Sequence, residues 1–233
     1  MTENFENQEQ IQQGDQADNQ VLTDTSVKVE PKSKKRVAAT TIAKVAILTA
    51  IAWILYVVAK FPLSFLFPSF LDMQISDLPA LLGGFSMGPL WGCVIVIIKC
   101  LLKMPMTTTG CVGELADILV GVAFVLPASI IYKRHKSKKS AFIGLLVGMA
   151  CAVLMAVVAN AFLLVPFYVN VFFDGSIEGL VGMVSSLYKG VTAETFYTYY
   201  ILLAVIPFNL LRCIISGGIT FIVYKRISKI LHR

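Results

Sequence analysis

Apolar runs of bilayer length recur from residue 37 to the end of the chain and restrict this sequence to a membrane fold. A transmembrane helix needs about 20 apolar residues, and the runs Val37 to Ala59, Ser140 to Val165 and Tyr197 to Tyr224 reach that length. They are continuous, whereas the strands of a membrane barrel alternate apolar and polar positions. With 57% hydrophobic residues, 15% charged residues and a mean hydropathy of +0.76, the chain is predicted to be a helical integral membrane protein.

The remaining apolar runs complete a predicted bundle of six transmembrane helices. Leu115 to Tyr132 is another full span, and Ile75 to Met87 and Gly88 to Lys103 are two short spans joined by a tight turn. Glycines interrupt both short spans, a pattern that is found near the binding sites of transporters. The predicted fold class is therefore all-α, with one six-helix transmembrane domain at 37–233.

Residues 1–36 are predicted to form a separate polar tail. Up to Glu30 the tail carries seven acidic residues and almost no apolar cluster, so burial cannot offset the entropy of ordering it, and we expect disorder. Basic residues cluster at Lys32 to Arg36, Lys133 to Lys139 and Lys225 to Arg233. Six spans put all three clusters on one side, which the positive-inside rule assigns to the cytoplasm together with both termini. The net charge of +6 thus indicates topology and not nucleic-acid binding.

An amide and a permanent cation, Asn209 and Arg212, lie inside the last apolar run. At 1.5 Å per residue they lie roughly 18 to 23 Å into a helix, near the bilayer midplane. Burying a charge there costs at least about 2.5 kcal/mol, so such a residue usually faces a bundle interior or wet cavity and pairs with another group. Pro207 also leaves a backbone carbonyl free one turn earlier. We interpret this stretch as one wall of a polar pocket; the alternative is a structural ion pair between two helices.

Other polar residues in the spans fall toward the opposite side from the basic clusters. Asn160 lies about one turn from the end of its span, and its amide, like that of Asn209, suits a ligand with amide or hydroxyl edges. Lys99 and Glu114 lie near the outer ends of neighbouring spans and are expected to form a structural ion pair, which Asp117 could share. The cavity is therefore predicted to open to the outside.

The sequence contains none of the enzyme or metal motifs that such a chain could carry. It has no GxxxxGK[ST] phosphate loop and no HExxH zinc motif. It also has no histidine within an apolar run, which a serine/histidine intramembrane protease would need. Its five cysteines lack the spacing of a zinc or redox site. No catalytic residue, metal site or cofactor is predicted. A transporter, receptor or substrate-capture subunit remains, with a membrane enzyme or a structural subunit as the alternative of another class.

Four segments resemble the riboflavin-binding S components of energy-coupling factor (ECF) transporters. They are LDMQISDLPALLGGFSMGPLWGCVIVIIKCLLK (Leu71 to Lys103), TTTGCVGELADILVGVAFVLPASIIYK (Thr107 to Lys133), VANAFLLVPFY (Val158 to Tyr168) and IPFNLLRCIISGGITFIVYK (Ile206 to Lys225). The resemblance implies the six-helix S-component fold and capture of riboflavin from outside. It also implies that the chain works with a transmembrane coupling subunit and two cytoplasmic ATPases.

The resemblance also assigns roles to individual residues. Ligand contacts in the family come from an asparagine late in the fifth helix and from a PFNxxK segment in the sixth, which match Asn160, Asn209 and Arg212. Arginine replaces the family's lysine, and its planar fork suits bidentate acceptors, so FMN or another vitamin is an alternative substrate. An AxxxA motif in the first helix contacts the coupling subunit, and Ala46 and Ala50 match it.

Overall fold

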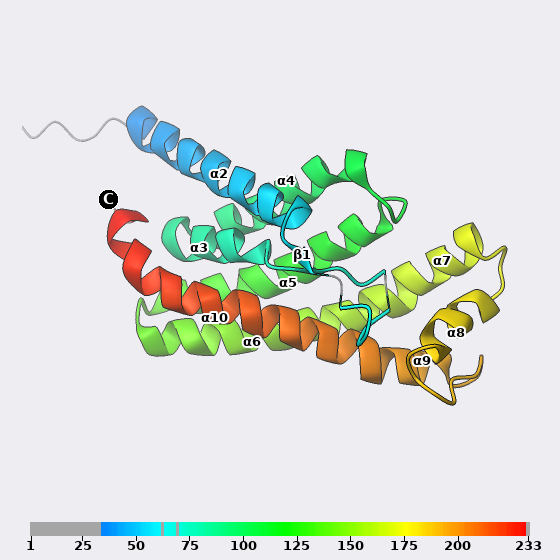
Figure 1. The fold of residues 1–233 in the computed structure, drawn as a ribbon. Helices are drawn as coiled ribbons and strands as arrows, with labels where there is room; N and C mark the ends of the chain where they lie inside the picture. Colours follow the sequence, from blue (N-terminus) through cyan, green and yellow to red (C-terminus); the bar gives the residue numbers. More distant parts are fainter. Residues whose placement is uncertain (1–33, 62, 69, 232–233) are drawn as a thin grey trace, which may run out of the picture. The chain divides into compact units, whose positions relative to one another are not determined.

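A computed structural model describes residues 34–61, 63–68 and 70–231, and helices dominate them (Figure 1). The elements in chain order are α2 (Lys34–Val57), β1 (Lys60–Phe61), β2 (Met73–Gln74), α3 (Asp77–Met87), α4 (Pro89–Lys103), the 3-10 turn η1 (Met104–Met106), α5 (Val112–Arg134), α6 (Lys138–Ala159), the π-helical segment η2 (Asn160–Leu164), α7 (Val165–Phe172), α8 (Glu178–Ser185), α9 (Phe196–Tyr199), the π-helical segment η3 (Tyr200–Val205) and α10 (Ile206–Leu231). The predicted tail lies outside the described residues up to position 33, and α2 begins within its basic end.

Five stretches of the described chain are long and apolar enough to cross a membrane. They are Ala39–Val57, Pro89–Met106, Val112–Arg134, Lys138–Phe172 and Phe196–Val223. The helix α3 has 11 residues and is therefore about 16 Å long, which is too short to cross a bilayer upright. The all-α membrane fold is confirmed, with five long spans and one short helix at the six predicted positions.

The end of the fifth span differs from its prediction. The sequence predicts that this span stops before Pro166, but the helix continues through η2 and α7 to Phe172. A π turn shifts the hydrogen bonds to i→i+5 and widens the helix, so the proline ring and its missing N–H are accommodated just after η2. Pro207 follows η3 in the same way.

The two long connections contain more order than apolar pattern alone indicates. Lys60 pairs with Gln74 and Phe61 with Met73 in a short antiparallel ladder. The sequence alone predicts a loop here, because Pro62 and Pro68 break the apolar pattern. In the connection between Phe167 and Thr195, apolar residues at helical spacing, Leu180 and Val184 among them, predict a short amphipathic helix. The structure confirms it as α8, which buries both residues.

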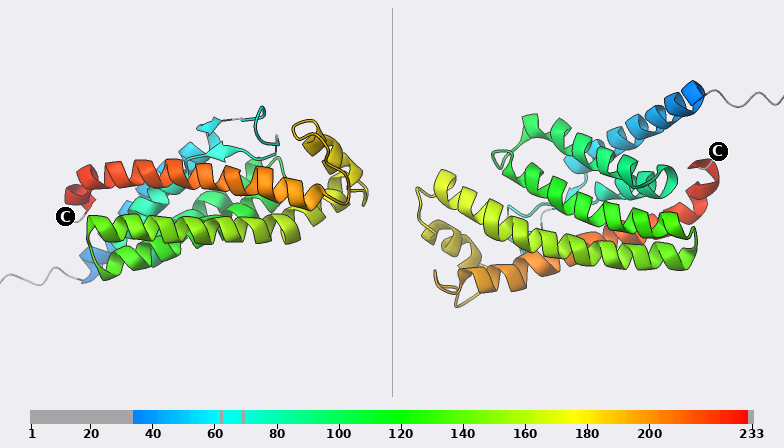
Figure 2. Two further views of the ribbon diagram at one scale, coloured as in Figure 1. Left: turned by 90° about the horizontal axis from the view of Figure 1, so that it is seen from below. Right: turned by 180° about the vertical axis from the view of Figure 1, so that it is seen from behind.

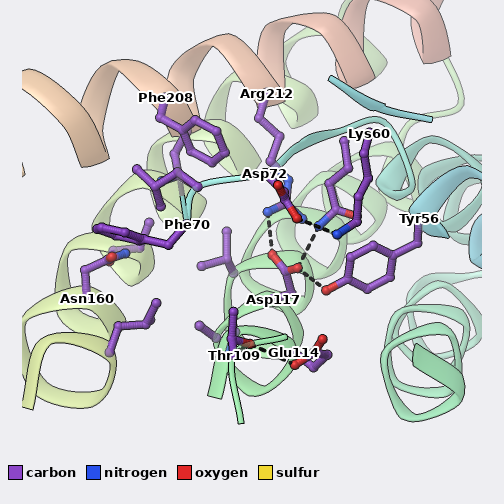
Figure 3. Close-up of a pocket in the computed structure, with 18 of the residues that line it drawn as sticks. Tyr56, Lys60, Phe70, Asp72, Thr109, Glu114, Asp117, Asn160, Phe208 and Arg212 are labelled. Carbon is purple, nitrogen blue, oxygen red and sulfur yellow. Dashed lines mark hydrogen bonds and ion pairs between the residues drawn. The ribbon is translucent and has the colours of Figure 1, made fainter. Parts of the chain in front are cut away.

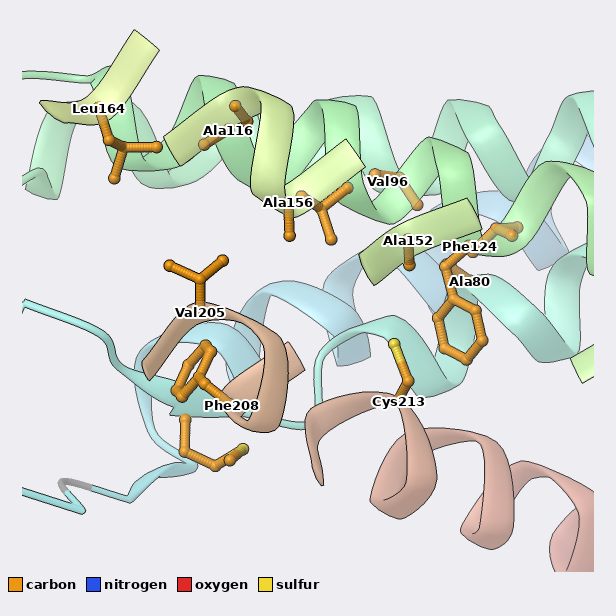
Figure 4. Packing of buried hydrophobic residues seen from close by; sticks show 14 of the residues in the cluster. Ala80, Val96, Ala116, Phe124, Ala152, Ala156, Leu164, Val205, Phe208 and Cys213 are labelled. Carbon is orange, nitrogen blue, oxygen red and sulfur yellow. The ribbon is translucent and has the colours of Figure 1, made fainter. Parts of the chain in front are cut away.

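Small residues bring α6 close to α5, and the two helices run side by side (Figures 1 and 2). Gly144, Gly148, Ala152 and Ala156 recur every four residues on α6, and all four are buried. A Cβ atom on Gly148 would lie 2.5 Å from the carbonyl oxygen of Phe124. Figure 4 shows Phe124, Ala152 and Ala156 within this core. Such close packing is a main source of helix association in lipid, where the hydrophobic effect between helices is weak.

We expect Gly148→Ala to destabilise the protein and Gly218→Ala to leave its stability unchanged or slightly higher. A methyl group on Gly148 meets backbone, so α5 and α6 must separate, at about 1–3 kcal/mol. The Cβ position of Gly218 has no atom within 4 Å, and alanine is the better helix former. Thermal unfolding in detergent, followed by intrinsic fluorescence, measures both variants. Equal melting temperatures would contradict the close contact.

Candidate polar binding site

A polar pocket lies among α5, α6, α10 and the loop that follows α2 (Figure 3). It encloses about 640 Å³ of space free of protein atoms, its open mouth included. The lining residues are Tyr56, Lys60, Phe70, Leu71, Asp72, Gln74, Lys103, Thr108, Thr109, Gly113, Glu114, Ala116, Asp117, Val120, Ala156, Asn160, Leu164, Phe208, Asn209 and Arg212. The three predicted ligand residues, Asn160, Asn209 and Arg212, therefore meet in one cavity.

The guanidinium group of Arg212 bridges two carboxylates on two other helices. Its Nε and Nη2 donate to Oδ2 of Asp77 at 3.1 and 2.9 Å, and its Nη1 donates to Oδ1 of Asp117 at 2.5 Å. Figure 3 shows Arg212 extending from α10 toward Asp117. A planar fork suits this double contact, because it directs its donors along fixed lines. Arg212 thus lines the pocket and also forms structural ion pairs between helices. The two interpretations of the sequence, a pocket residue and a structural ion pair, both apply to it.

Hydrogen bonds from Lys99 close these ion pairs into a ring. Lys99 Nζ donates to Oδ1 of Asp77 at 2.5 Å and to Oγ of Ser76 at 2.6 Å. Ser76 donates to the amide oxygen of Gln74 at 2.8 Å, and the Gln74 amide nitrogen donates to Asp117 at 2.6 Å. The ring holds two cations and two carboxylates, so its formal charges cancel. Such a network is stable away from water because each charge has partners.

The predicted ion pair between Lys99 and Glu114 is wrong, because each residue has a different partner. Lys99 pairs with Asp77, whereas Glu114 accepts a hydrogen bond from Lys103 at 3.1 Å and one from Thr107 at 2.7 Å. Lys99 and Lys103 are one helical turn apart on α4. Lys103 is level with the start of α5, where Glu114 lies. Lys99 lies one turn away, beside α3 and Asp77. The sequence identified the right kind of contact but misplaced its register by one turn.

The two asparagines sit beside the π-helical segments. Asn160 is the first residue of η2, and its Nδ2 donates to the carbonyl oxygen of Ala156 at 2.8 Å. Its Oδ1 accepts a hydrogen bond of 2.6 Å from the hydroxyl of Tyr200, the first residue of η3. Asn209 donates to Val205 O at 2.8 Å. These bonds orient both amides at the pocket, and the bond between Asn160 and Tyr200 joins η2 to η3.

Residues at the end of α2 and in the loop after it complete the pocket, and sequence reasoning did not assign them to it. The hydroxyl of Tyr56 donates to Oδ2 of Asp117, and Lys60 forms an ion pair with Asp72. Phe70 lies opposite Tyr56 in Figure 3, on the side of Asn160. One signal in the sequence could have located the partner of Arg212. Its neighbours in the sequence are apolar, so it requires a carboxylate from another segment, and few carboxylates occur near the predicted spans.

The predicted docking residues Ala46 and Ala50 lie outside this pocket. Both are exposed on α2, and only 22% of the α2 span is buried, against 33–44% of the other four spans. The structure therefore leaves this face of α2 free within the described chain.

Comparisons with known proteins agree with this architecture. The family model described as "ECF transporter, substrate-specific component" matches residues 40–224. The riboflavin transporter RibU of Staphylococcus aureus (strain TCH60) is 31% identical over 189 residues, covering 81% of this chain and 90% of the relative. The riboflavin transporter FmnP of Bacillus subtilis (strain 168) is 31% identical over 127 residues, covering 53% of this chain and 66% of the relative.

A solved structure gives the same result at the level of fold. It is described as the S component of a bacterial ECF transporter and has a TM-score of 0.63 and 29% sequence identity. The match covers 84% of this chain and 99% of that one. The family model spans most of the sequence, and one curated relative is 31% identical over 81% of it. The chain therefore belongs to the substrate-specific (S) components of ECF transporters.

Proposed function

We propose that this chain captures riboflavin in the polar pocket and delivers it across the membrane with an ATP-driven coupling module. The observation that carries the proposal is the meeting of Asn160, Asn209 and Arg212 in one cavity, in a chain similar to two riboflavin transporters. Amide donors and acceptors beside aromatic walls suit a flat heterocycle with carbonyl groups and a polyhydroxyl chain.

The charge balance of the pocket favours riboflavin over its phosphorylated form. Within the described chain, the three cations in the lining already have carboxylate partners: Lys60 with Asp72, Lys103 with Glu114, and Arg212 with Asp77 and Asp117. A phosphate adds about −1.5 to −2 charges, and removing that charge from water without a free cation is unfavourable. Riboflavin is neutral and needs hydrogen bonds only, so we infer that FMN is the weaker ligand.

Titration of the purified protein in detergent, followed by quenching of flavin fluorescence, tests the proposal. We expect one-to-one quenching by the protein with riboflavin and at least about tenfold weaker binding of FMN, since an unpaired buried charge costs more than about 1.4 kcal/mol. Unchanged riboflavin fluorescence would overturn the proposed function. Tighter binding of FMN would overturn the charge argument alone.

Asn160→Ala supplies the site-specific prediction, with Asn170→Ala as its matched control. Truncating Asn160 removes a buried amide and leaves the Tyr200 hydroxyl without its acceptor, so we expect riboflavin affinity to fall about tenfold. Asn170 is exposed on α7 and does not line the pocket, so its variant should bind as the parent does. Equal affinities of the two variants would remove Asn160 from the site.

The proposal includes an orientation in the membrane. The side chains of the turn between α5 and α6 are exposed and strongly basic from Lys133 to Lys139, and the positive-inside rule places such a turn in the cytoplasm. Asp117 lies about 25 Å along α5 from Arg134 at 1.5 Å per residue. The pocket would then open to the outside, and the exposed face of α2 would dock the coupling subunit that acts with two ATPases.

A further inference from the structure

A second cavity, of opposite character, lies between α6 and α10. This groove, which we call the α6–α10 groove, encloses about 600 Å³, its open side included. Its lining residues are apolar side chains, a cysteine and glycines: Phe142, Leu145, Leu146, Met149, Cys213, Ile214, Gly217, Gly218 and Phe221. It contributes nothing to the polar pocket, because the two cavities share no lining residue.

The groove has a defined direction, because α6 and α10 run antiparallel beside each other (Figures 1 and 2). At one end the rings of Phe142 and Phe221 form an edge contact with centroids 6.2 Å apart. Further along, a side-chain carbon of Leu145 lies 3.5 Å from the Cβ position of Gly217. The groove extends along α6 from Phe142 to Met149, about 10 Å at 1.5 Å per residue. A slot of this length and polarity fits part of a hydrocarbon chain.

Positive charge lies at the Phe142 end of the groove. Lys138 and Lys139 come four and three residues before Phe142, so helical periodicity puts them on the same face of α6, one turn beyond the groove. Both are exposed. Ser137 caps the helix by accepting a hydrogen bond from the Ser140 N–H at 3.1 Å, and the helix N-terminus adds a partial positive charge. An apolar slot with cations at one end is complementary to an anionic amphiphile.

We propose that the α6–α10 groove binds one acyl chain of an anionic phospholipid, with its phosphate held by Lys138, Lys139 and the N-terminus of α6. The lipid comes from the leaflet that meets the basic turn, so its chain enters the groove past Phe142 and Phe221. Basic residues beside a bilayer attract anionic lipids by about 1 kcal/mol each. The adjoining slot adds a preference for one bound molecule over the surrounding lipid.

Native mass spectrometry of the detergent-purified protein tests the head-group contact. The probes are palmitoyl-oleoyl phosphatidylglycerol and palmitoyl-oleoyl phosphatidylcholine, which share their acyl chains. We expect one tightly retained phosphatidylglycerol per chain and weaker retention of phosphatidylcholine. In K138Q/K139Q the preference should fall about fivefold for each lysine removed. K189Q, which removes an exposed lysine after α8, should keep it.

A groove-filling variant tests the acyl-chain contact. Gly218→Phe places a ring in the slot without a backbone clash, since no atom lies within 4 Å of its Cβ position, and it should reduce retention of both lipids. Ile222→Phe is the matched control, because Ile222 is exposed on α10 outside the groove lining. Riboflavin quenching should be unchanged in all variants, which checks folding and separates this proposal from the proposed function.

Results of three kinds would overturn the lipid site. One is equal retention of the two lipids by the parent protein. Another is an unchanged preference in K138Q/K139Q, or unchanged retention in Gly218→Phe. The third is a dimer of the chain that forms without lipid and is lost in Gly218→Phe, since a second copy would then occupy the groove.

Discussion

Asp77→Asn is expected to destabilise the protein by about 3–5 kcal/mol, because it leaves two buried cations without their shared carboxylate. Asp77 is 1% exposed and accepts from Lys99 on one oxygen and from Arg212 on the other. An asparagine can replace one acceptor but carries no charge. Removing one member of a buried ion network is more harmful than removing the whole network, because desolvated charges remain.

Unfolding of the ligand-free protein in detergent measures this effect, with Asp72→Asn as the control. Asp72 also pairs with a lysine, but its side chain is 41% exposed, so its loss should change the free energy of unfolding by less than about 1 kcal/mol. Asp77→Asn/Lys99→Met restores the formal charge balance and should recover part of the stability. Equal stabilities of the two asparagine variants would show that the ring is not a structural element.

The same ring changes how substitutions of Arg212 should be interpreted. From sequence, Arg212→Ala is expected to weaken flavin binding while the protein stays folded. In the structure that change would strand Asp77 and Asp117, so lost binding could not be separated from lost packing. Substitutions of Asn160 and Asn209 test the ligand contact more directly. Both residues are neutral, so replacing them leaves no buried charge without its partner.

The sequence predicts the spans well because bilayer length is a local property of the chain. It also predicts that Arg212 needs partners, since a charge at that depth is unfavourable alone. It does not identify the partners: they depend on the register of α3, α4 and α5, which tertiary packing sets. The sequence predicts Glu114 as the partner of Lys99, whereas the structure has Asp77, and this is an error of that kind.

The π-helical segments were unpredictable for a related reason. A proline in an apolar run normally indicates the end or a kink of a helix, so the fifth span is predicted to end before Pro166. Whether the chain instead inserts a widened turn depends on what the turn contacts. Here Asn160 and Tyr200, at the starts of η2 and η3, bond to each other across two helices, a contact between residues far apart in sequence.

Replacing Ala46 and Ala50 together by tryptophan is expected to abolish riboflavin uptake by cells while leaving riboflavin binding intact. Both alanines are exposed on the least buried of the long spans, and neither lines the pocket. Small residues four apart let helices approach closely in a membrane, so two indole rings would hold the proposed coupling subunit away from α2. Uptake of labelled riboflavin and fluorescence quenching by the purified variant measure the two properties separately.

Ile51→Trp is the matched control for this double variant. Ile51 is 43% exposed on the same helix but lies about 100° around it from Ala50, so its ring should meet lipid and leave uptake unchanged. If the double variant lost binding as well, the rings would have disturbed the fold and not the docking. If it kept full uptake, the coupling subunit would have to contact another helix, while the pocket could still capture riboflavin. Loss of uptake alone would separate capture from coupling and assign coupling to this face of α2.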